Sequence, residues 1–217
     1  MQLRLFASLP PEDMRRVLAV ARRRTFSRNE VVFHRGDPAD SLHIVTEGRF
    51  AVQVATRFGD AATVAVRGPG DVFGELALLS AEATRSATVS ALEPGETQSV
   101  YVDDLTRLRK KYPGVNEMML LILSSQLRRT NDLLLEFLYL PAERRVLRRV
   151  LDLVEIYADS EGEAVIPLTQ VHLAGLAGTS RETVNRVLRE EVARGTIELG
   201  RGKVVVVDAA AIGDRAR

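Results

Sequence analysis

The segment PGVNEMMLLILSSQLRRTNDLLLEFLYL, residues 113–140, decides the architecture because it predicts one long helix in the middle of the chain. Pro113 suits the first position of a helix and Pro141 stops one, so we expect roughly seven turns and a length of about 40 Å. Along it, residues recur at alternating steps of three and four, which is typical of the seam of a two-stranded coiled coil. The positions of this predicted seam are Leu120, Leu123, Leu127, Thr130, Leu134 and Phe137.

A second apolar set on the same segment lies off the seam and predicts a face directed at the helix's own domain. We therefore expect the helix to have two partners, its own domain and a second copy of the chain. The residues of this second set are Met118, Leu121, Ile122, Leu133 and Leu135.

Thr130 places a hydroxyl in a row of hydrocarbon side chains, and Asn131 follows it directly. One interpretation is that a single polar residue fixes the register and the oligomeric state of the coiled coil. The other is that Thr130 and Asn131 contact a polar ligand between two chains, since a buried hydroxyl and a buried amide need hydrogen-bond partners. This segment alone leaves both open.

The composition narrows the class of protein. The chain has 217 residues, which suggests one or two domains, and 46% of them are hydrophobic, which is ample for a core. The net charge is +1, so any nucleic-acid surface must be local. The absence of cysteine excludes disulfides, zinc fingers, thiol switches and cysteine-ligated iron–sulfur clusters. We see no secretory signal and no apolar run near the ~20 residues that span a membrane, and we expect a cytoplasmic protein with no membrane contact.

The N-terminal half changes from a helical to a strand-like pattern. Residues 1–24 predict a short amphipathic helix with Met14, Val17, Leu18 and Ala21 on one face. Residues 25–102 then contain short runs rich in β-branched side chains, separated by glycine and proline, and their even spacing predicts a small antiparallel roll or barrel. The runs fall at 31–34, 42–45, 50–55, 62–66, 85–91 and 97–102.

One interruption of the roll predicts a binding site for an anion. A short helical turn is expected to start at Gly74, Glu75 and Leu76, where backbone amides are free to bind an anion, and Arg85 supplies a planar cation opposite them. A carboxylate is unsuited to phosphate binding, so Glu75 makes sense as the acceptor for a sugar hydroxyl beside the phosphate. The alternative is that Glu75 and Arg85 form an ordinary surface ion pair, which contributes little.

The C-terminal third predicts a helix-turn-helix. Residues 142–157 read as a helix, and residues 167–178 read as a short helix capped by Thr169. Ser180 is a good N-cap for the next helix, on which Val184, Val187 and Leu188 form the inward face. The residues expected to point outward near its start are Arg181, Glu182, Asn185 and Arg186.

This second helix has the side chains of a recognition helix in the major groove, because arginine pairs with guanine and glutamate accepts from cytosine. A hairpin at 195–207 follows, and its basic residues are expected to contact phosphate. A charged, solvated helix with internal pairing is the alternative. The candidate DNA-binding residues are Thr169, Gln170, Ser180, Arg181, Glu182, Thr183, Arg186, Arg201 and Lys203.

Three of these motifs resemble the CRP/FNR family of bacterial transcription regulators. FGEL at 73–76 and RSA at 85–87, with Glu75 and Arg85 ten positions apart, resemble its phosphate-binding cassette. SRETVNR at 180–186 resembles its recognition helix, and RRTN at 128–131 is similar to actinobacterial members. The resemblance implies an α+β protein with a cyclic-nucleotide-binding antiparallel β-roll at 1–112, a dimerisation helix and hinge at 113–140, and a winged helix-turn-helix at 141–217.

The resemblance also implies roles for individual residues. Glu75 would bind the ribose 2′-hydroxyl of cyclic AMP, while Arg85, Ser86 and the amides of 74–76 would hold its cyclic phosphate. Thr130 and Asn131 would contact the adenine amino group, one from each subunit of a homodimer. The recognition helix would read a TGTGA-type half-site in double-stranded DNA, and the loop at 158–163 would contact RNA polymerase. The ligand-binding residues implied are thus Gly74, Glu75, Leu76, Arg85, Ser86, Thr130 and Asn131.

Enzymatic function is not indicated. His34, His43 and His172 lack the spacing of metal ligands, and no nucleophile or base lies in a catalytic pattern, so we expect neither an enzyme nor a metal. Two alternatives stay open beside a regulator controlled by cyclic AMP. One is the same kind of regulator with another effector or none. The other is a cyclic-nucleotide-binding module that acts through protein contacts.

Overall fold

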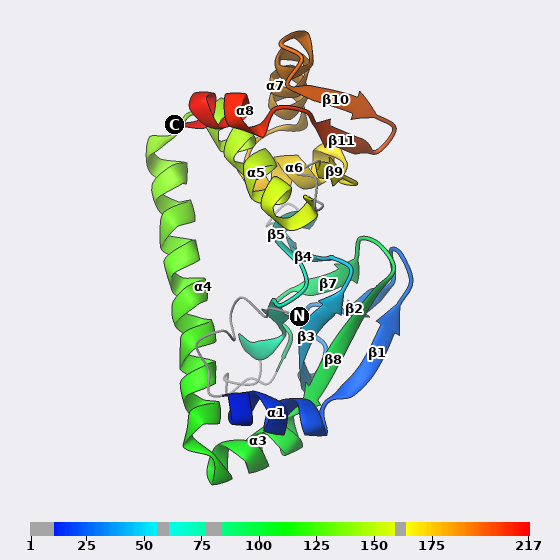
Figure 1. Cartoon of the computed structure of the whole chain (residues 1–217), viewed down its shortest axis with the longest axis vertical. Helices are drawn as coiled ribbons and strands as arrows, with labels where there is room; N and C mark the ends of the chain where they lie inside the picture. Colours follow the sequence, from blue (N-terminus) through cyan, green and yellow to red (C-terminus); the bar gives the residue numbers. More distant parts are fainter. Residues whose placement is uncertain (1–10, 56–60, 77–83, 159–163) are drawn as a thin grey trace. The chain divides into compact units, whose positions relative to one another are not determined.

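The computed structural model describes residues 11–55, 61–76, 84–158 and 164–217 (Figure 1). The chain forms two compact units, and the boundary along the long helix falls between Thr130 and Asn131. None of the helices in these ranges is long and apolar enough to cross a membrane.

The first unit contains the predicted antiparallel roll, built from two four-stranded sheets. The first sheet has the spatial order β1 (Arg22–Phe26), β8 (Gly95–Tyr101), β3 (Ser41–Glu47) and β6 (Val72–Phe73). The second has the order β2 (Val31–Phe33), β7 (Thr88–Ala91), β4 (Phe50–Ala55) and β5 (Ala61–Arg67).

The N-terminal helix is shorter than predicted. α1 spans Pro11–Val20, and residues 22–24, which we expected to be helical, belong to the edge strand β1. Register explains the difference, because Arg22 pairs with Ser99 and Phe26 with Gly95 of β8. Cross-strand pairing with β8 therefore outweighs the local helical pattern. Residues 1–10 lie outside the described part of the chain.

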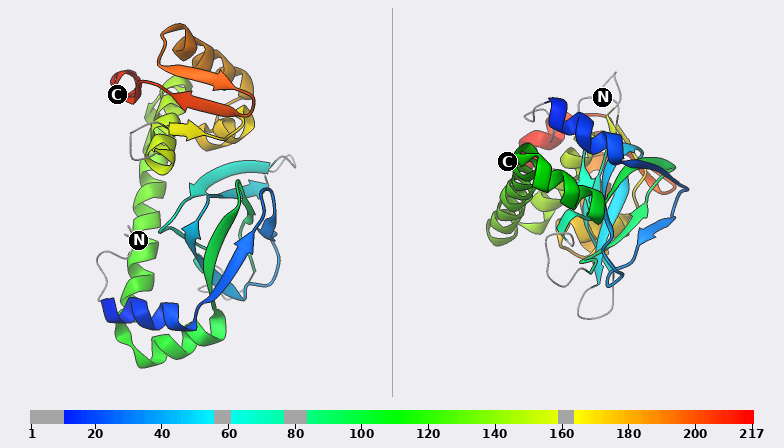
Figure 2. Two further views of the ribbon diagram at one scale, coloured as in Figure 1. Left: turned by 45° about the vertical axis from the view of Figure 1, so that its right-hand side comes forward. Right: turned by 90° about the horizontal axis from the view of Figure 1, so that it is seen from below.

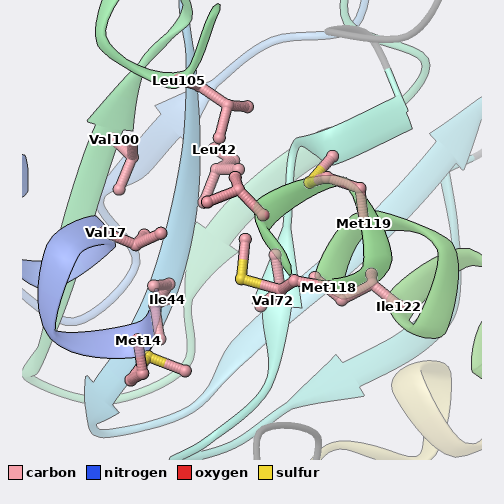
Figure 3. Close-up of a cluster of buried hydrophobic side chains, with 11 residues drawn as sticks. Met14, Val17, Leu42, Ile44, Val72, Val100, Leu105, Met118, Met119 and Ile122 are labelled. Carbon is pink, nitrogen blue, oxygen red and sulfur yellow. The ribbon is translucent and has the colours of Figure 1, made fainter. Parts of the chain in front are cut away.

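Three helices close one side of the roll over a shared apolar core (Figure 3). α3 (Val102–Lys111), which the sequence did not indicate, precedes α4 (Pro113–Tyr139), the predicted long helix. Both pack with α1 and strands β3, β6 and β8. The core residues are Met14, Val17, Leu42, Ile44, Val72, Val100, Leu105, Val115, Met118, Met119 and Ile122.

The inward face of α4 was predicted only in part. Met118 and Ile122 are buried as expected, and Val115 and Met119 complete a stripe at helical spacing on the first half of the helix. Leu121 and Leu135 do not lie on it, because their exposed fractions are 38% and 53%, and Leu133 is half-buried. The expected inward set was wrong because the buried stripe covers only the first turns of α4.

The predicted seam of α4 is largely open in the single chain. Leu120, Leu127 and Leu134 are 65%, 62% and 55% exposed, and Thr130 is exposed between them. Single exposed leucines are ordinary, but a row of them at coiled-coil spacing is a surface that a second helix would cover.

One histidine is buried in the aromatic interior of the roll. His43 is 1% exposed, and its ring stacks on Phe73 with 4.9 Å between centroids. Its Nδ1 lies 3.0 Å from the hydroxyl oxygens of both Thr97 and Ser99, and its Nε2 lies 3.3 Å from that of Ser41. Burial, with Arg85 and Arg24 acting in the same direction, lowers the pKa of His43 to about 3.

His43 should make the stability of this unit depend on pH. The unfolded imidazole takes up a proton below about pH 6.5. The folded one, whose pKa is about 3, does not, so stability present above pH 6.5 is lost as the pH falls toward 3. In this window, we expect His43 to lower the free energy of unfolding by up to about 1.4 kcal/mol for each pH unit by which the pH falls. Urea unfolding at several pH values should show a shallower decline of stability for His43→Gln than for the wild type, and an equal decline would contradict the prediction.

The second unit contains the predicted helix-turn-helix and a small sheet (Figure 2). α5 spans Ala142–Tyr157, as predicted. β9, for which the sequence pattern predicted no strand, pairs with β11 so that Ile166 lies opposite Val204. The remaining elements are β9 (Ala164–Ile166), α6 (Gln170–Ala177), α7 (Arg181–Ala193), β10 (Ile197–Gly200), β11 (Lys203–Val206) and α8 (Ala209–Ala216).

The caps of the two short helices are those that the sequence indicated. Thr169 caps α6 in a reciprocal capping box with His172. Gly178 ends this helix with a φ of +55°, in the left-handed region that favours glycine. Ser180 caps α7, where its hydroxyl accepts from the amide of Thr183 at 3.2 Å. The predicted inward face of α7 is buried and consists of Val184, Val187 and Leu188.

Candidate functional site

A pocket in the first unit brings together the predicted residues of the interrupted roll. Gly74, Glu75, Leu76, Arg85 and Ser86 all line it. Two further lining residues, Arg67 at the end of β5 and Gln126 on α4, were not predicted. The strand β6 leads directly into the turn at 74–76, which places the backbone of this turn opposite Arg85.

Arg85 is held rigidly in the pocket wall. It is 3% exposed, and its Nη1 donates to the carbonyls of Ser41 at 2.5 Å and Gly74 at 3.2 Å. Its Nη2 donates to Asp40 at 2.9 Å, and the ring of Phe33 lies 4.1 Å from the guanidinium carbon. Burial lowers the pKa of Arg85, and Asp40 opposes the shift. Since arginine starts from so high a pKa, the group remains a cation.

Glu75 is also buried, with 3% exposure, and the partner of Arg85 is Asp40 rather than Glu75. The alternative of a surface ion pair between Glu75 and Arg85 is therefore wrong. Within the described residues, Glu75 Oε2 is buried without a hydrogen-bond partner. An unpaired buried carboxylate oxygen is costly unless a ligand donates to it, so the pocket fits a ligand that carries a hydroxyl beside an anion. Ser86 is exposed at the pocket, where its hydroxyl is accessible.

Two features of the structure require glycine at position 74: a backbone conformation that favours glycine and the lack of space for a Cβ atom. Its φ is +83°, and a Cβ there would lie 2.8 Å from Arg85 Nη1 and 3.1 Å from the carbonyl oxygen of Ser41. We expect Gly74→Ala to displace Arg85 and to weaken binding of the anionic ligand roughly tenfold or more, as for loss of a charge-assisted hydrogen bond. Gly36 is a matched control, because its φ is +90° and nothing lies within 4 Å of its added Cβ. Titration calorimetry on both alanine variants would contradict the prediction if they lost equal affinity.

Thr130 and Asn131, the predicted ligand contacts on α4, do not line the pocket in the single chain. Thr130 Oγ1 donates to the carbonyl oxygen of Gln126 at 2.9 Å, so the hydroxyl bonds its own helix. Thr130 and Asn131 are exposed in the single chain, whereas Gln126, one turn earlier, lines the pocket. A role of Thr130 and Asn131 toward a ligand stays a prediction. The signal for Gln126 in the sequence is its position four residues before Thr130, on the same face of the helix.

The second unit gathers several of the predicted DNA-binding residues around one hollow. Thr169, Gln170, Arg181 and Lys203 line it, at the starts of α6 and α7 and on the hairpin. Arg201, in the hairpin turn, is exposed. Polar side chains at two helix starts and a basic hairpin form a surface suited to a phosphate backbone.

On α7, the two charged residues expected to read bases have different surroundings. Glu182 is exposed, and hydrogen bonds from its own amide and from Ser180 lower its pKa. Arg186 donates to Glu143 of α5 at 2.6 Å and to Glu190 at 3.2 Å. No local pattern predicted the pair with Glu143, which is 43 residues away. All of these side chains are accessible to a ligand from solvent.

A ligand pocket in a β-roll, on one chain with a winged helix-turn-helix, defines a DNA-binding protein that carries a ligand-binding domain. Residues 23–112 match the family model of the cyclic nucleotide-binding domain, and residues 144–215 match that of the Crp-like helix-turn-helix domain. The chain belongs to the CRP/FNR family of transcriptional regulators, and it is not an enzyme.

Relatives of known kind cover nearly the whole chain. The cyclic AMP receptor protein of Thermus thermophilus is 35% identical over 95% of this chain and 93% of its own length. The CRP-like cAMP-activated global transcriptional regulator of Mycobacterium tuberculosis is 31% identical over 88% of this chain and 87% of its own. The crystal structure of Thermus thermophilus catabolite activator protein matches with a TM-score of 0.55 and 32% identity, and covers 98% and 97% of the two chains.

Proposed function

We propose that this regulator is a homodimer that responds to cyclic AMP in the cytoplasm and binds a palindromic, TGTGA-like operator. The observation that carries the proposal is the unpaired, buried Glu75 oxygen in the same pocket as Arg85. Its domains would be the β-roll at 1–112, the dimerisation helix and hinge at 113–140, and the winged helix-turn-helix at 141–217.

The pocket's chemistry supports a cyclic nucleotide as effector. Arg85, the exposed hydroxyl of Ser86 and the amides of 74–76 offer donors to a cyclic phosphate. Glu75 offers an acceptor to the ribose 2′-hydroxyl. Thr130 and Asn131 would then contact the adenine amino group, one from each subunit. Adenine as the base is supported by the two relatives whose names include cyclic AMP.

The exposed seam of α4 supports the homodimer. Leu120, Leu127 and Leu134 repeat at coiled-coil spacing and are more than half exposed in the single chain. A second α4 packed along this stripe would remove their hydrocarbon from water. It would also bring a second Thr130 and Asn131 to the ligand.

Coupling of ligand binding to DNA binding would follow from a ligand that bridges the cassette and α4. Cyclic AMP held between the cassette of one subunit and α4 would change how two α4 helices pack. The hinge near Leu140 and Pro141 would then set two recognition helices about 34 to 36 Å apart, one turn of DNA. This requires the ligand to prefer the DNA-competent arrangement. An RNA polymerase contact at 158–163 falls mostly on residues outside the described ranges.

Two measurements test this function. Calorimetric titration with cyclic AMP, beside cyclic GMP, should show micromolar binding of cyclic AMP. A palindromic TGTGA-type duplex should then bind more tightly with cyclic AMP, and more weakly as salt rises. Absence of heat with cyclic AMP, in protein free of carried-over nucleotide, would exclude this effector. Absence of sequence-selective, salt-dependent DNA binding would favour a module that acts through protein contacts.

Arg186 is expected to contribute to sequence reading. Its replacement by alanine should weaken operator binding roughly tenfold or more and relax the preference at one base pair, because a guanidinium pairs bidentately with guanine. Arg189→Ala, at an exposed arginine of the same helix, is the matched control and should not change the preference. Binding to a set of operators with single base-pair changes would measure this. Equal weakening on all of them would assign Arg186 to phosphate instead.

A further inference from the structure

The unsatisfied polar atoms of the pocket describe what a ligand must supply. Among the residues with described positions, Glu75 Oε2, Arg85 Nε and Arg67 Nε line this pocket and are buried without hydrogen-bond partners. One is an acceptor and two are donors. The proposed contacts with ribose and phosphate give a role to Glu75 and Arg85. They leave Arg67 without one.

Within the described part of the chain, Arg67 has no hydrogen-bond or ion-pair partner that explains its place in the pocket wall. Neighbouring Asp71 accepts from the amide of Gly68 at 3.0 Å. Across the described ranges, no ion pair of 4.0 Å or shorter joins Arg67 to Asp71 or to Glu75. Burial lowers the pKa of Arg67, with Asp71 and Glu75 opposing the shift and Arg129 adding to it. A buried N–H without an acceptor costs about 1 to 3 kcal/mol, so we expect a ligand to supply an acceptor to the Nε–H of Arg67.

The parts of a cyclic nucleotide that already have assigned contacts leave the base for Arg67. Arg67, Glu75, Arg85 and Gln126 of α4 line the same pocket. With phosphate at Arg85 and ribose at Glu75, the base is the part of the nucleotide without an assigned protein donor, and Arg67 is the unsatisfied donor of the pocket without an assigned acceptor.

We propose that Arg67 is a base-contacting residue of this pocket, and that its guanidinium donates to a ring nitrogen of the purine. The inference rests on the proposed function and deepens it. Arginine has donors and no acceptor, and the purine nitrogens N3 and N7 are acceptors, so the two match. N3 and N7 lie on different edges of the base, and analogues that lack one or the other distinguish them. A residue that only balanced the charge of Glu75 would not sense either nitrogen.

Calorimetric titration with cyclic AMP, 3-deaza-cyclic AMP and 7-deaza-cyclic AMP tests this on the full-length wild-type chain. One of the two analogues should bind about tenfold more weakly than cyclic AMP, which corresponds to about 1.4 kcal/mol. Arg67→Met keeps an unbranched side chain without a donor, and this variant should bind cyclic AMP about tenfold more weakly than the wild type does. The variant should no longer distinguish cyclic AMP from the analogue that the wild type binds weakly. Arg28→Met, at an exposed arginine, is the matched control and should behave as wild type.

The outcomes separate this inference from the proposed function. Wild-type protein that binds no cyclic AMP would overturn both. Wild-type protein that binds cyclic AMP and both analogues equally would overturn only the contact with a ring nitrogen, and this comparison needs no variant. A wild type that discriminates between the analogues, together with an Arg67→Met variant that discriminates equally, would assign the contact to another residue. If Arg67→Met does not fold, Arg67→Leu, which also lacks a donor, replaces it.

Discussion

Replacement of Arg85 by leucine is expected to weaken cyclic AMP binding at least roughly a hundredfold. The guanidinium is buried, and its Nη1 and Nη2 are held by Ser41, Gly74 and Asp40. Within the described residues its Nε has no partner and is free to donate to the phosphate, and a charge-assisted hydrogen bond contributes about 1.5 to 3 kcal/mol. Leucine supplies neither charge nor donor. Calorimetric titration measures the loss, and circular dichroism shows whether the roll is intact.

Two further variants show whether the affinity lost in Arg85→Leu is due to the charge, to the planar geometry or only to the loss of an arginine. Arg85→Lys keeps the charge without the planar fork, so an affinity between those of wild type and Arg85→Leu is expected. Arg28→Leu makes the same chemical change at an exposed position and should leave binding unchanged. Wild-type affinity in a folded Arg85→Leu protein would show that the phosphate does not lie at Arg85.

Replacement of Glu191 by alanine is expected to destabilise the DNA-binding unit by about 3 kcal/mol, the low end for breaking a buried ion pair. The side chain is 2% exposed, accepts from Thr196 at 2.6 Å and from Arg194 at 3.0 Å, and pairs with Arg215. It thereby joins α7 to the start of the hairpin and to α8. Burial raises the pKa of Glu191, but the hydrogen bonds from Arg215 and Thr196 outweigh it, so the pKa is lowered.

The neighbouring glutamate provides the matched control. Glu190 is 46% exposed and pairs with Arg186 and Arg194 at the surface, so Glu190→Ala should cost less than about 1 kcal/mol. Chemical unfolding of both variants, followed by helical circular dichroism, compares them directly. Equal destabilisation would mean that burial of Glu191 contributes nothing beyond an ordinary surface pair.

The elements that sequence reasoning predicted correctly carry their own local signals. α4 has helical periodicity bounded by Pro113 and Pro141, α5 has helical periodicity that starts after Pro141, and α6 and α7 have side-chain caps. Strand β1 lacks such a signal, because three consecutive arginines become a strand only by pairing with β8. The same holds for β9, which is three residues long and depends on β11. Whether these segments form strands depends on their partners in the tertiary structure, which a local sequence pattern does not contain.

In the pocket, the sequence motif located Gly74, Glu75 and Arg85 but not their partners. Asp40 was not singled out, because its contact with Arg85 joins residues 45 positions apart. Arg67 ends a strand-like run, where an arginine ordinarily reaches solvent. Only the fold shows that its Nε is buried in the pocket wall. Burial of this atom in the pocket, rather than residue type, makes Arg67 a candidate.

The hydrogen bond from Thr130 to the carbonyl oxygen of Gln126 has a consequence for the choice between purines. The hydroxyl proton is already used within the helix, so the oxygen can only receive a further hydrogen bond. The amino group at position 6 of adenine offers a proton, and the oxo group of guanine at the same position has none. If the proposed contact forms, Thr130 rejects guanine, because lone pairs of the threonine oxygen and of the guanine oxo group would face each other. No further side chain is then needed to exclude guanine.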